Sequence, residues 1–239
     1  MAYAQKNELK PWLRQPWVIP PKQNAAFVVA TEDVPDVYAR PHDPARPAVC
    51  VDEGGKQLIG DVRGPLPVRP RRPARQDSEY ERGGMADPFM CFEPLAGVRH
   101  AGVTERKTSV DFARCLRTVS DTHYADAGRI VPVCDNFSTH TPAASYEAFG
   151  PDEAHRLARR FEWHHPPRHG SRLDMAETEL SVLARQCLDR RVPDAATPER
   201  EVAAWERQRN AAAVKVHWQF TTADARTKLH RLYPTIPLQ

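Results

Sequence analysis

Long hydrophobic runs are missing from this sequence. The longest apolar segments are short, such as residues 25–30, and none has the length that a membrane-spanning helix needs. The first ten residues are polar and lack the apolar stretch of a secretory signal. We therefore expect no membrane partner and a cytoplasmic protein.

Cysteine is scarce, and its spacing excludes two classes of protein. The chain has five cysteines, an odd number, and no two of them form a Cys-x-x-Cys pair. A disulfide framework or a zinc ribbon is therefore not expected. Most of the cysteines lie inside apolar patterns, which predicts buried free thiols.

An excess of charge of one sign is also missing. The net charge is only +3, which is too small to indicate a nucleic-acid partner by itself. Hydrophobic residues make up 41% and charged residues 27% of the 239 residues, a balance typical of a folded globular chain with one sizeable core.

Proline, in contrast, is frequent, with 23 residues, and it clusters in residues 65–75, which read PLPVRPRRPAR. Proline has no backbone N–H, so this segment cannot form a helix interior or a central strand. We predict an extended, stiff and cationic loop.

The remaining pattern predicts strands before helices. A short helix is expected over residues 23–34, ended by Pro35. Thr108 and Asp111 have the spacing of a helix cap, and Thr141-Pro142 is a second helix start. Strands are expected at residues 48–52, 57–62, 88–93, 98–105, 129–134 and 161–164. Helices are expected from about residue 109, over 142–160 in two pieces, and at 175–190, 197–212 and 223–232.

This order predicts the fold class. Successive strands favour antiparallel meander pairing, whereas strands separated by helices favour parallel crossovers. A mixed sheet flanked by helices, an α/β fold, satisfies both expectations.

Two aspartates follow apolar runs that should be buried. Asp52 comes directly after residues 48–51, and Asp135 comes directly after residues 130–134. A carboxylate there is costly unless it is paired, hydrogen-bonded or bound to metal. Neighbouring strand ends can bring two such groups together, and a divalent cation would relieve their repulsion. The alternative interpretation is that each aspartate only ends a strand and starts a turn.

A third acid could come from the helix that begins near residue 175. Glu177 and Glu179 lie about 160° apart around a helix, so only one of them can face a shared site. Asp174 and Glu177 also have the spacing of a capping box, a purely structural role. Helical geometry alone does not choose between the two glutamates.

These segments together resemble the transposases of the insertion sequence 630 family, in the mariner-type superfamily. The matching pieces are VCVDE at 49–53, QLIG at 57–60, CDN at 134–136 with TH at 139–140, and RHGSRLDMAE at 168–177. The resemblance runs from about Lys6 to Pro234. It implies an RNase H-like mixed five-stranded sheet flanked by helices, and two regions: an arm or linker with a short helix over 1–45, and a DDE catalytic domain over 46–234.

The resemblance also implies a site and a chemistry. The acidic triad falls on Asp52, Asp135 and Glu177, because the family pattern Leu-Asn-x-x-Glu matches residues 173–177. These carboxylates would hold two Mg²⁺ or Mn²⁺ ions for hydrolysis of phosphodiesters at transposon ends and for strand transfer into target DNA. The implied partners are double-stranded DNA and a second copy of the chain in a homodimer. The protein would associate with the bacterial nucleoid when bound to DNA.

Candidate DNA contacts lie in two places. We hypothesise that arginines in and beside the proline-rich loop contact phosphates, and the alternative is an ordinary solvated loop. These arginines are Arg63, Arg69, Arg71, Arg72 and Arg75. The resemblance suggests that His169 orients groups near Glu177 or the DNA. A zinc site built from His164, His165 and His169 is disfavoured, because no cysteine lies nearby to complete it.

The sequence departs from the family pattern beside the proposed site. Arg172 stands where the family usually has Trp, Asp174 where it has Asn, and Gly54-Gly55 where it has Lys-Pro. The family's N-terminal helix-turn-helix half has no counterpart, so we expect the catalytic half only. The alternatives are an inactive remnant that binds DNA without cutting, a standalone RNase H-like nuclease, and a structural protein whose acids only cap helices and strands.

Overall fold

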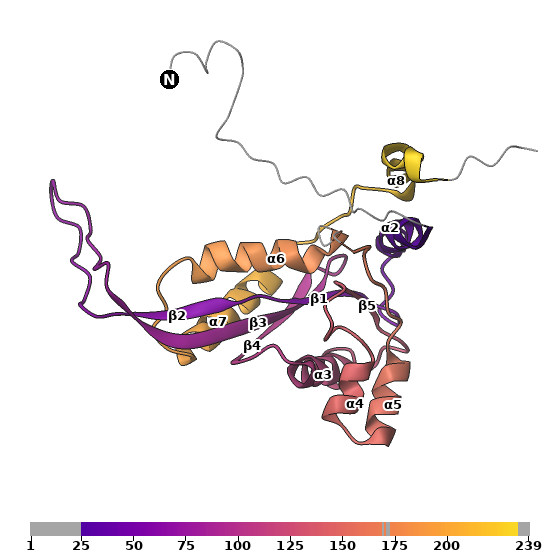
Figure 1. The fold of residues 1–239 in the computed structure, drawn as a ribbon, viewed down its shortest axis with the longest axis horizontal. Coiled ribbons are helices and arrows are strands. Elements are labelled where there is room, and N and C mark those ends of the chain that lie inside the picture. The colour runs from indigo at the N-terminus through magenta and orange to yellow at the C-terminus, as the bar shows by residue number, and fades with distance from the viewer. Residues whose placement is uncertain (1–24, 169, 171–172, 234–239) are drawn as a thin grey trace, which may run out of the picture.

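A mixed five-stranded sheet forms the centre of the molecule (Figure 1), in a computed structural model that describes residues 25–168, 170 and 173–233. The central strand β1 (Ala48–Glu53) pairs antiparallel with β3 (Tyr80–Glu93) and parallel with β5 (Val131–Cys134). The opposite edge of β3 pairs antiparallel with β4 (Val98–Thr104). The predicted α/β class and mixed five-stranded sheet are confirmed.

The pairing of strand β2 (Lys56–Asp61) differs from the meander that we expected. Strand β2 does not pair with β1 but continues along the same edge of β3, with Glu53 opposite Phe89 and Lys56 opposite Ala86. Only Gly54 and Gly55 separate the two strands, and the 14 residues of β3 provide an edge long enough for both. The first half of β3 was not predicted because its exposed residues form no apolar run.

A short segment extends the sheet beyond β5. Ile130 pairs with Phe161 and Val133 with His164 through parallel backbone bridges. This position agrees with the strand predicted at residues 161–164.

Helices cover both faces of the sheet. Helices α6 (Met175–Leu183), α7 (Ala196–Ala211) and α2 (Ala25–Tyr38) share one hydrophobic core with inward-facing strand residues such as Cys50 and Val133. Helices α3 (Ser109–Thr118), α4 (Ala143–Ala148) and α5 (Pro151–Arg160) lie on the other face (Figure 1), where Val49 and Val51 join the core. Alternate residues of β1 therefore enter different cores, as the pleat of a strand requires.

Helix α2 continues past Pro35, although we expected Pro35 to end it. Proline removes one backbone donor, but Val34, Val37 and Tyr38 are all buried in the core. Burial of these side chains offsets the lost hydrogen bond, which tertiary packing commonly does.

The other helices follow the sequence signals closely. The capping box predicted for Thr108 and Asp111 is present at the start of α3. Helix α4 begins one residue later than expected, with Pro142 at the cap position and no side-chain cap. Helix α6 runs on through a π-helical turn, Ala184–Leu188, and α8 spans Thr222–Lys228 before a 3₁₀ turn, His230–Leu232. Among the described residues, no helix combines the length and apolar character that crossing a membrane requires.

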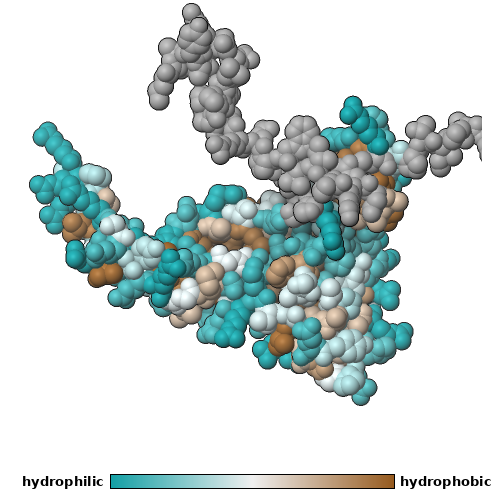
Figure 2. All heavy atoms as spheres, in the orientation of Figure 1, coloured by the Kyte–Doolittle hydropathy of each residue, from teal (hydrophilic) through white to brown (hydrophobic). Residues whose placement is uncertain are grey.

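The proline-rich segment forms an arm that projects from the sheet between β2 and β3 (Figure 1). It is extended, as predicted, but it folds back on itself, with paired backbones at Leu66 and Arg75 and at Arg69 and Arg72. Arg71 has a φ of 61° at the tip and follows Pro70, the combination that a type II turn uses. Figure 2 shows that the arm is mostly hydrophilic, with a few hydrophobic patches.

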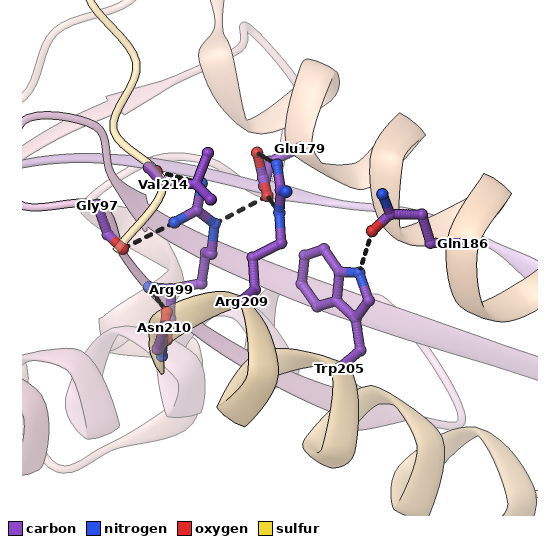
Figure 3. Close-up of polar contacts among 8 residues, drawn as sticks. All are labelled: Gly97, Arg99, Glu179, Gln186, Trp205, Arg209, Asn210 and Val214. Atoms are coloured by element: carbon purple, nitrogen blue, oxygen red, sulfur yellow. Dashed lines mark hydrogen bonds and ion pairs between the residues drawn. The ribbon is translucent and has the colours of Figure 1, made fainter. Parts of the chain in front are cut away.

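A buried ion network fixes α6 and α7 to the sheet (Figure 3). Arg99 of β4 donates to Glu179 of α6 at 2.8 Å, and Arg209 of α7 donates to the same carboxylate at 2.6 Å. The Arg99 side chain is 0% and the Glu179 side chain 2% exposed. Arg99 also donates to the carbonyls of Gly97 and Val214, so each of its three side-chain nitrogens has an acceptor. Burial raises the pKa of Glu179, but the hydrogen bonds from both arginines outweigh this effect and lower it.

Removing the charge of Glu179 should destabilise the fold strongly. The change Glu179→Gln leaves Arg99 buried without a counter-ion, and breaking a buried pair in this way costs on the order of 3–5 kcal/mol. Denaturant unfolding measures the change. The control is Glu153→Gln, which breaks the exposed pair of Glu153 with Arg156 and should cost less than about 1 kcal/mol. Equal losses in the two variants would contradict a structural role for the network.

Candidate active site

The ends of the two parallel strands bring Asp52 and Asp135 together. The last pair in the register of β1 with β5 joins Val51 to Cys134, and each aspartate is the next residue along its strand. Neighbouring strands lie about 5 Å apart, so the two aspartates leave the sheet side by side. Sequence analysis allowed this meeting, because the two apolar runs end at these aspartates and neighbouring strand ends can bring such groups together.

Side-chain alternation sets the direction in which these carboxylates point. Asp52 lies two residues after Cys50, and Asp135 lies two residues after Val133 and four after Val131. Residues spaced by two along a strand point to the same face of the sheet. Cys50, Val131 and Val133 belong to the core on the α6 side of the sheet. Both aspartates therefore emerge toward α6, at the carboxyl ends of parallel strands where α/β proteins commonly bind ligands.

His140 ties the neighbouring acids together. Its Nδ1 lies 2.6 Å from Oδ1 of Asp135, and its Nε2 lies 2.7 Å from Oε2 of Glu53. The imidazole is 1% exposed and packs against the ring of Phe112, with 4.4 Å between centroids. The two hydrogen bonds and this contact fix the position of Oδ1 of Asp135.

Burial and charge shift the pKa values in opposite directions. Burial, together with a smaller contribution from the nearby Asp135 carboxylate, raises the pKa of Asp52 to about 7, against the hydrogen bond from the Glu53 backbone N–H. Burial lowers the pKa of His140, but its bonds to Asp135 and Glu53 outweigh this effect and raise the value to about 9. Burial raises the pKa of Asp135, yet His140 and the Phe137 backbone N–H leave it below its ordinary value. At neutral pH a charged His140 therefore donates to both carboxylates.

The first turn of α6 brings further acids to this point. Asp174 caps the helix by accepting a hydrogen bond from the Ala176 N–H at 2.8 Å. Burial, and then the carboxylate of Asp52, raises the pKa of Asp174 well above its ordinary range, and Glu177 and Asp135 act in the same direction. The Asp174 carboxyl therefore interacts electrostatically with Asp52, Asp135 and Glu177, the three residues of the predicted triad.

The two glutamates of α6 have separate surroundings. Glu179 is buried between Arg99 and Arg209, so its carboxylate is already neutralised. Glu177 lies in the first turn of α6 and is part-buried. The ion network therefore gives Glu179 a structural role, and the role of Glu177 in the site stays a prediction.

The donor set fits a hard divalent cation. Ligand atoms of Asp52, Glu53 and His140 all lie within 4.8 Å of one another, and no other trio of potential ligands in the described part of the chain is that close. Carboxylate oxygens suit Mg²⁺, and added imidazole nitrogen is compatible with Mn²⁺. Asp135 contacts this group through His140, and neither Asp135 nor Glu177 belongs to the trio itself.

Sequence analysis missed Glu53 and His140 as parts of the site. Both lie inside the segments that carry the family resemblance, one directly after Asp52 and the other five residues after Asp135. A histidine in a short polar turn after a candidate ligand was the available signal. His169 lies outside the described residues.

The remaining histidines of the cluster are held by protein groups. His164 lies 2.6 Å from a carboxylate oxygen of Asp33 and 3.0 Å from one of Glu162, and His165 lies 3.0 Å from the Cys134 carbonyl. These contacts give His164 and His165 structural roles.

Comparison with family models identifies the family of this chain. The model of the family described as DDE superfamily endonuclease matches residues 47–197. The chain belongs to this family. No curated protein matches it in sequence.

Two solved structures of the Mos1 transposon system have a similar fold. The chain aligns with the Mos1 mariner paired end complex with Mn at 14% identity and a TM-score of 0.53, covering 89% of this chain and 69% of that one. The Mos1 strand transfer complex aligns at 14% identity and a TM-score of 0.50, covering 96% and 70%. The family match confirms the prediction of a DDE domain, and the fold shared with these two structures confirms the predicted RNase H-like architecture.

The metal-free DDE domain should lose stability as Asp52 ionises. The pKa of Asp52 is about 7 in the folded state, above its ordinary value of 3.8. Ionisation of Asp52 therefore favours the unfolded chain as pH rises from 3.8 to about 7. We expect Asp52→Asn to melt higher than the wild type by a margin that grows from about pH 4 to about pH 7 and then levels off. Thermal melts in EDTA measure the margin, with the exposed Asp126→Asn as control. A margin that stays constant over this range would contradict the shift.

Proposed function

We propose that this chain is the catalytic core of a cut-and-paste DNA transposase in which Asp52, Asp135 and Glu177 hold two Mg²⁺ or Mn²⁺ ions. The observation that carries the proposal is the meeting of Asp52 and Asp135 at adjacent parallel strand ends, facing the first turn of α6. The family match to DDE endonucleases supports it.

The chain's own residues have distinct tasks in this proposal. When bound, divalent ions would lower the pKa of the attacking water or 3′-hydroxyl and would stabilise the leaving oxygen. Asp52 and Asp135 hold the ions on the sheet side, and Glu177 holds them from α6. His140 and Glu53 keep Asp135 oriented through the two short contacts of the imidazole. The insertion sequence 630 assignment belongs to the proposal and rests on the quoted segments.

Double-stranded DNA is the proposed substrate, comprising transposon ends and target. The similar Mos1 structures are a paired end complex and a strand transfer complex. A homodimer is the corresponding assembly for this chain. The arginine-bearing arm would lie along the DNA backbone, since its exposed guanidinium groups carry charge well beyond the sheet.

DNA cleavage should require both the metal and the triad. Wild-type protein is expected to nick supercoiled plasmid in Mn²⁺ or Mg²⁺ and to lose nicking in EDTA. Asp52→Asn, Asp135→Asn and Glu177→Gln should each reduce the rate at least about 100-fold, because each removes a ligand charge from the site that stabilises the transition state. Asp126→Asn should retain full rate.

The same assay separates the alternatives. Binding without any nicking would favour an inactive remnant over a transposase. Digestion of DNA or of an RNA–DNA hybrid, without joined products, would favour an RNase H-like nuclease.

The arm should contribute to the salt dependence of DNA binding. If Arg71 and Arg72 each neutralise one phosphate, the Arg71→Ala, Arg72→Ala protein loses two contacts, and the slope of log K against log salt falls by about 1.8. Fluorescence anisotropy across a salt series measures this slope. The control, Arg159→Ala with Arg207→Ala, removes two exposed arginines from α5 and α7. An unchanged slope in the arm variant would remove the arm from the DNA interface.

A further inference from the structure

Asp174 has a carboxylate oxygen that the fold does not use. The residue is 0% exposed, and its Oδ1 accepts the capping hydrogen bond from Ala176 at 2.8 Å. Its Oδ2 is buried and has no hydrogen-bond partner. A buried unpaired carboxylate oxygen is costly, so it needs a cation or a proton.

Helix capping does not explain this oxygen. Capping uses one acceptor, and Ser, Thr or Asn would provide it equally well without a second charged oxygen. The cost of the extra carboxylate therefore points to a second role.

The surroundings offer Asp174 acids rather than a basic partner. The carboxylates of Asp52, Glu177 and Asp135 are its electrostatic neighbours. The Tyr38 hydroxyl donates to the carbonyl of Leu173, the residue before Asp174, at 2.8 Å. The cations of the proposed site are the positive charges that would complement this oxygen.

We propose that Oδ2 of Asp174 is a further ligand for the divalent cations held by Asp52, Asp135 and Glu177. This inference rests on the proposed function. Three carboxylates carry three negative charges against the four positive charges of two divalent ions, and Asp174 supplies the fourth. Affinity for hard cations rises with the number of charged oxygen ligands, so this chain should bind Mg²⁺ and Mn²⁺ more tightly than a triad alone would.

Calorimetric titration of Mn²⁺ into the metal-free full chain tests the role. Asp174→Asn keeps the capping oxygen and removes the charge, and we expect its Mn²⁺ affinity to fall at least about tenfold. The control is Asp194→Asn, because Asp194 also accepts a backbone N–H at 2.8 Å, from Thr197, but does so at an exposed position just before α7. Its affinity should equal that of the wild type.

Thermal melts give a second readout. Without metal, Asp174→Asn should melt above the wild type, because folding no longer has to bury a charge or take up a proton at this position, and Mn²⁺ should raise its melting temperature by less. Asp174→Ser, also a helix-capping residue, gives the same comparison should the Asn variant not fold.

The outcomes distinguish this inference from the function on which it rests. Loss of Mn²⁺ binding in Asp52→Asn with unchanged or tighter binding in Asp174→Asn overturns only the role of Asp174. Absence of Mn²⁺ binding in the wild type, or equal binding in wild type and Asp52→Asn, overturns the metal site itself and Asp174 with it.

Discussion

Repulsion between carboxylates at the ends of β1 and β5 is the constraint around which this domain is organised. Parallel pairing places Asp52 beside Asp135, and the first turn of α6 adds Asp174. Such a concentration of acids opposes folding unless positive charge or hydrogen bonds offset it. His140 offsets part of it in the metal-free protein by donating to Asp135 and Glu53. Divalent ions would offset the rest, which couples metal binding to stability.

Rigid attachment of α6 makes this arrangement possible. The carboxylate of Glu179 is held by arginines from β4 and α7, two elements that flank the helix. At the other end, the Tyr38 hydroxyl of α2 donates to the Leu173 carbonyl, just before the cap of α6. The helix is thus fixed at its start and in its second turn. Glu177 lies between these attachments, so its backbone position is determined by contacts outside the site.

The sequence predicted the parts of this fold that depend on local pattern. Apolar runs located β1 and β5, and therefore Asp52 and Asp135, because burial selects for such runs whatever the neighbours are. The cap at Thr108 followed from spacing that is short enough to act within one helical turn. The mixed sheet followed from the order of strands and helices.

Features that depend on distant partners were not predictable in this way. The first half of β3 forms because β2 lies beside it, and its own residues give no signal. Helix α2 passes Pro35 because distant strands bury its last turn. The role of Glu179 depends on Arg99, 80 residues away, and on Arg209. The contacts of His140 with Glu53 span 87 residues.

The prolines of the projecting arm have a consequence for self-association. An exposed two-stranded arm with apolar residues such as Leu66 and Val68 would ordinarily offer free backbone edges on which another copy could add a strand. Pro65, Pro67, Pro70 and Pro73 lack the N–H groups that such pairing requires. The arm can therefore extend into solvent and remain available for a ligand without seeding aggregates edge to edge.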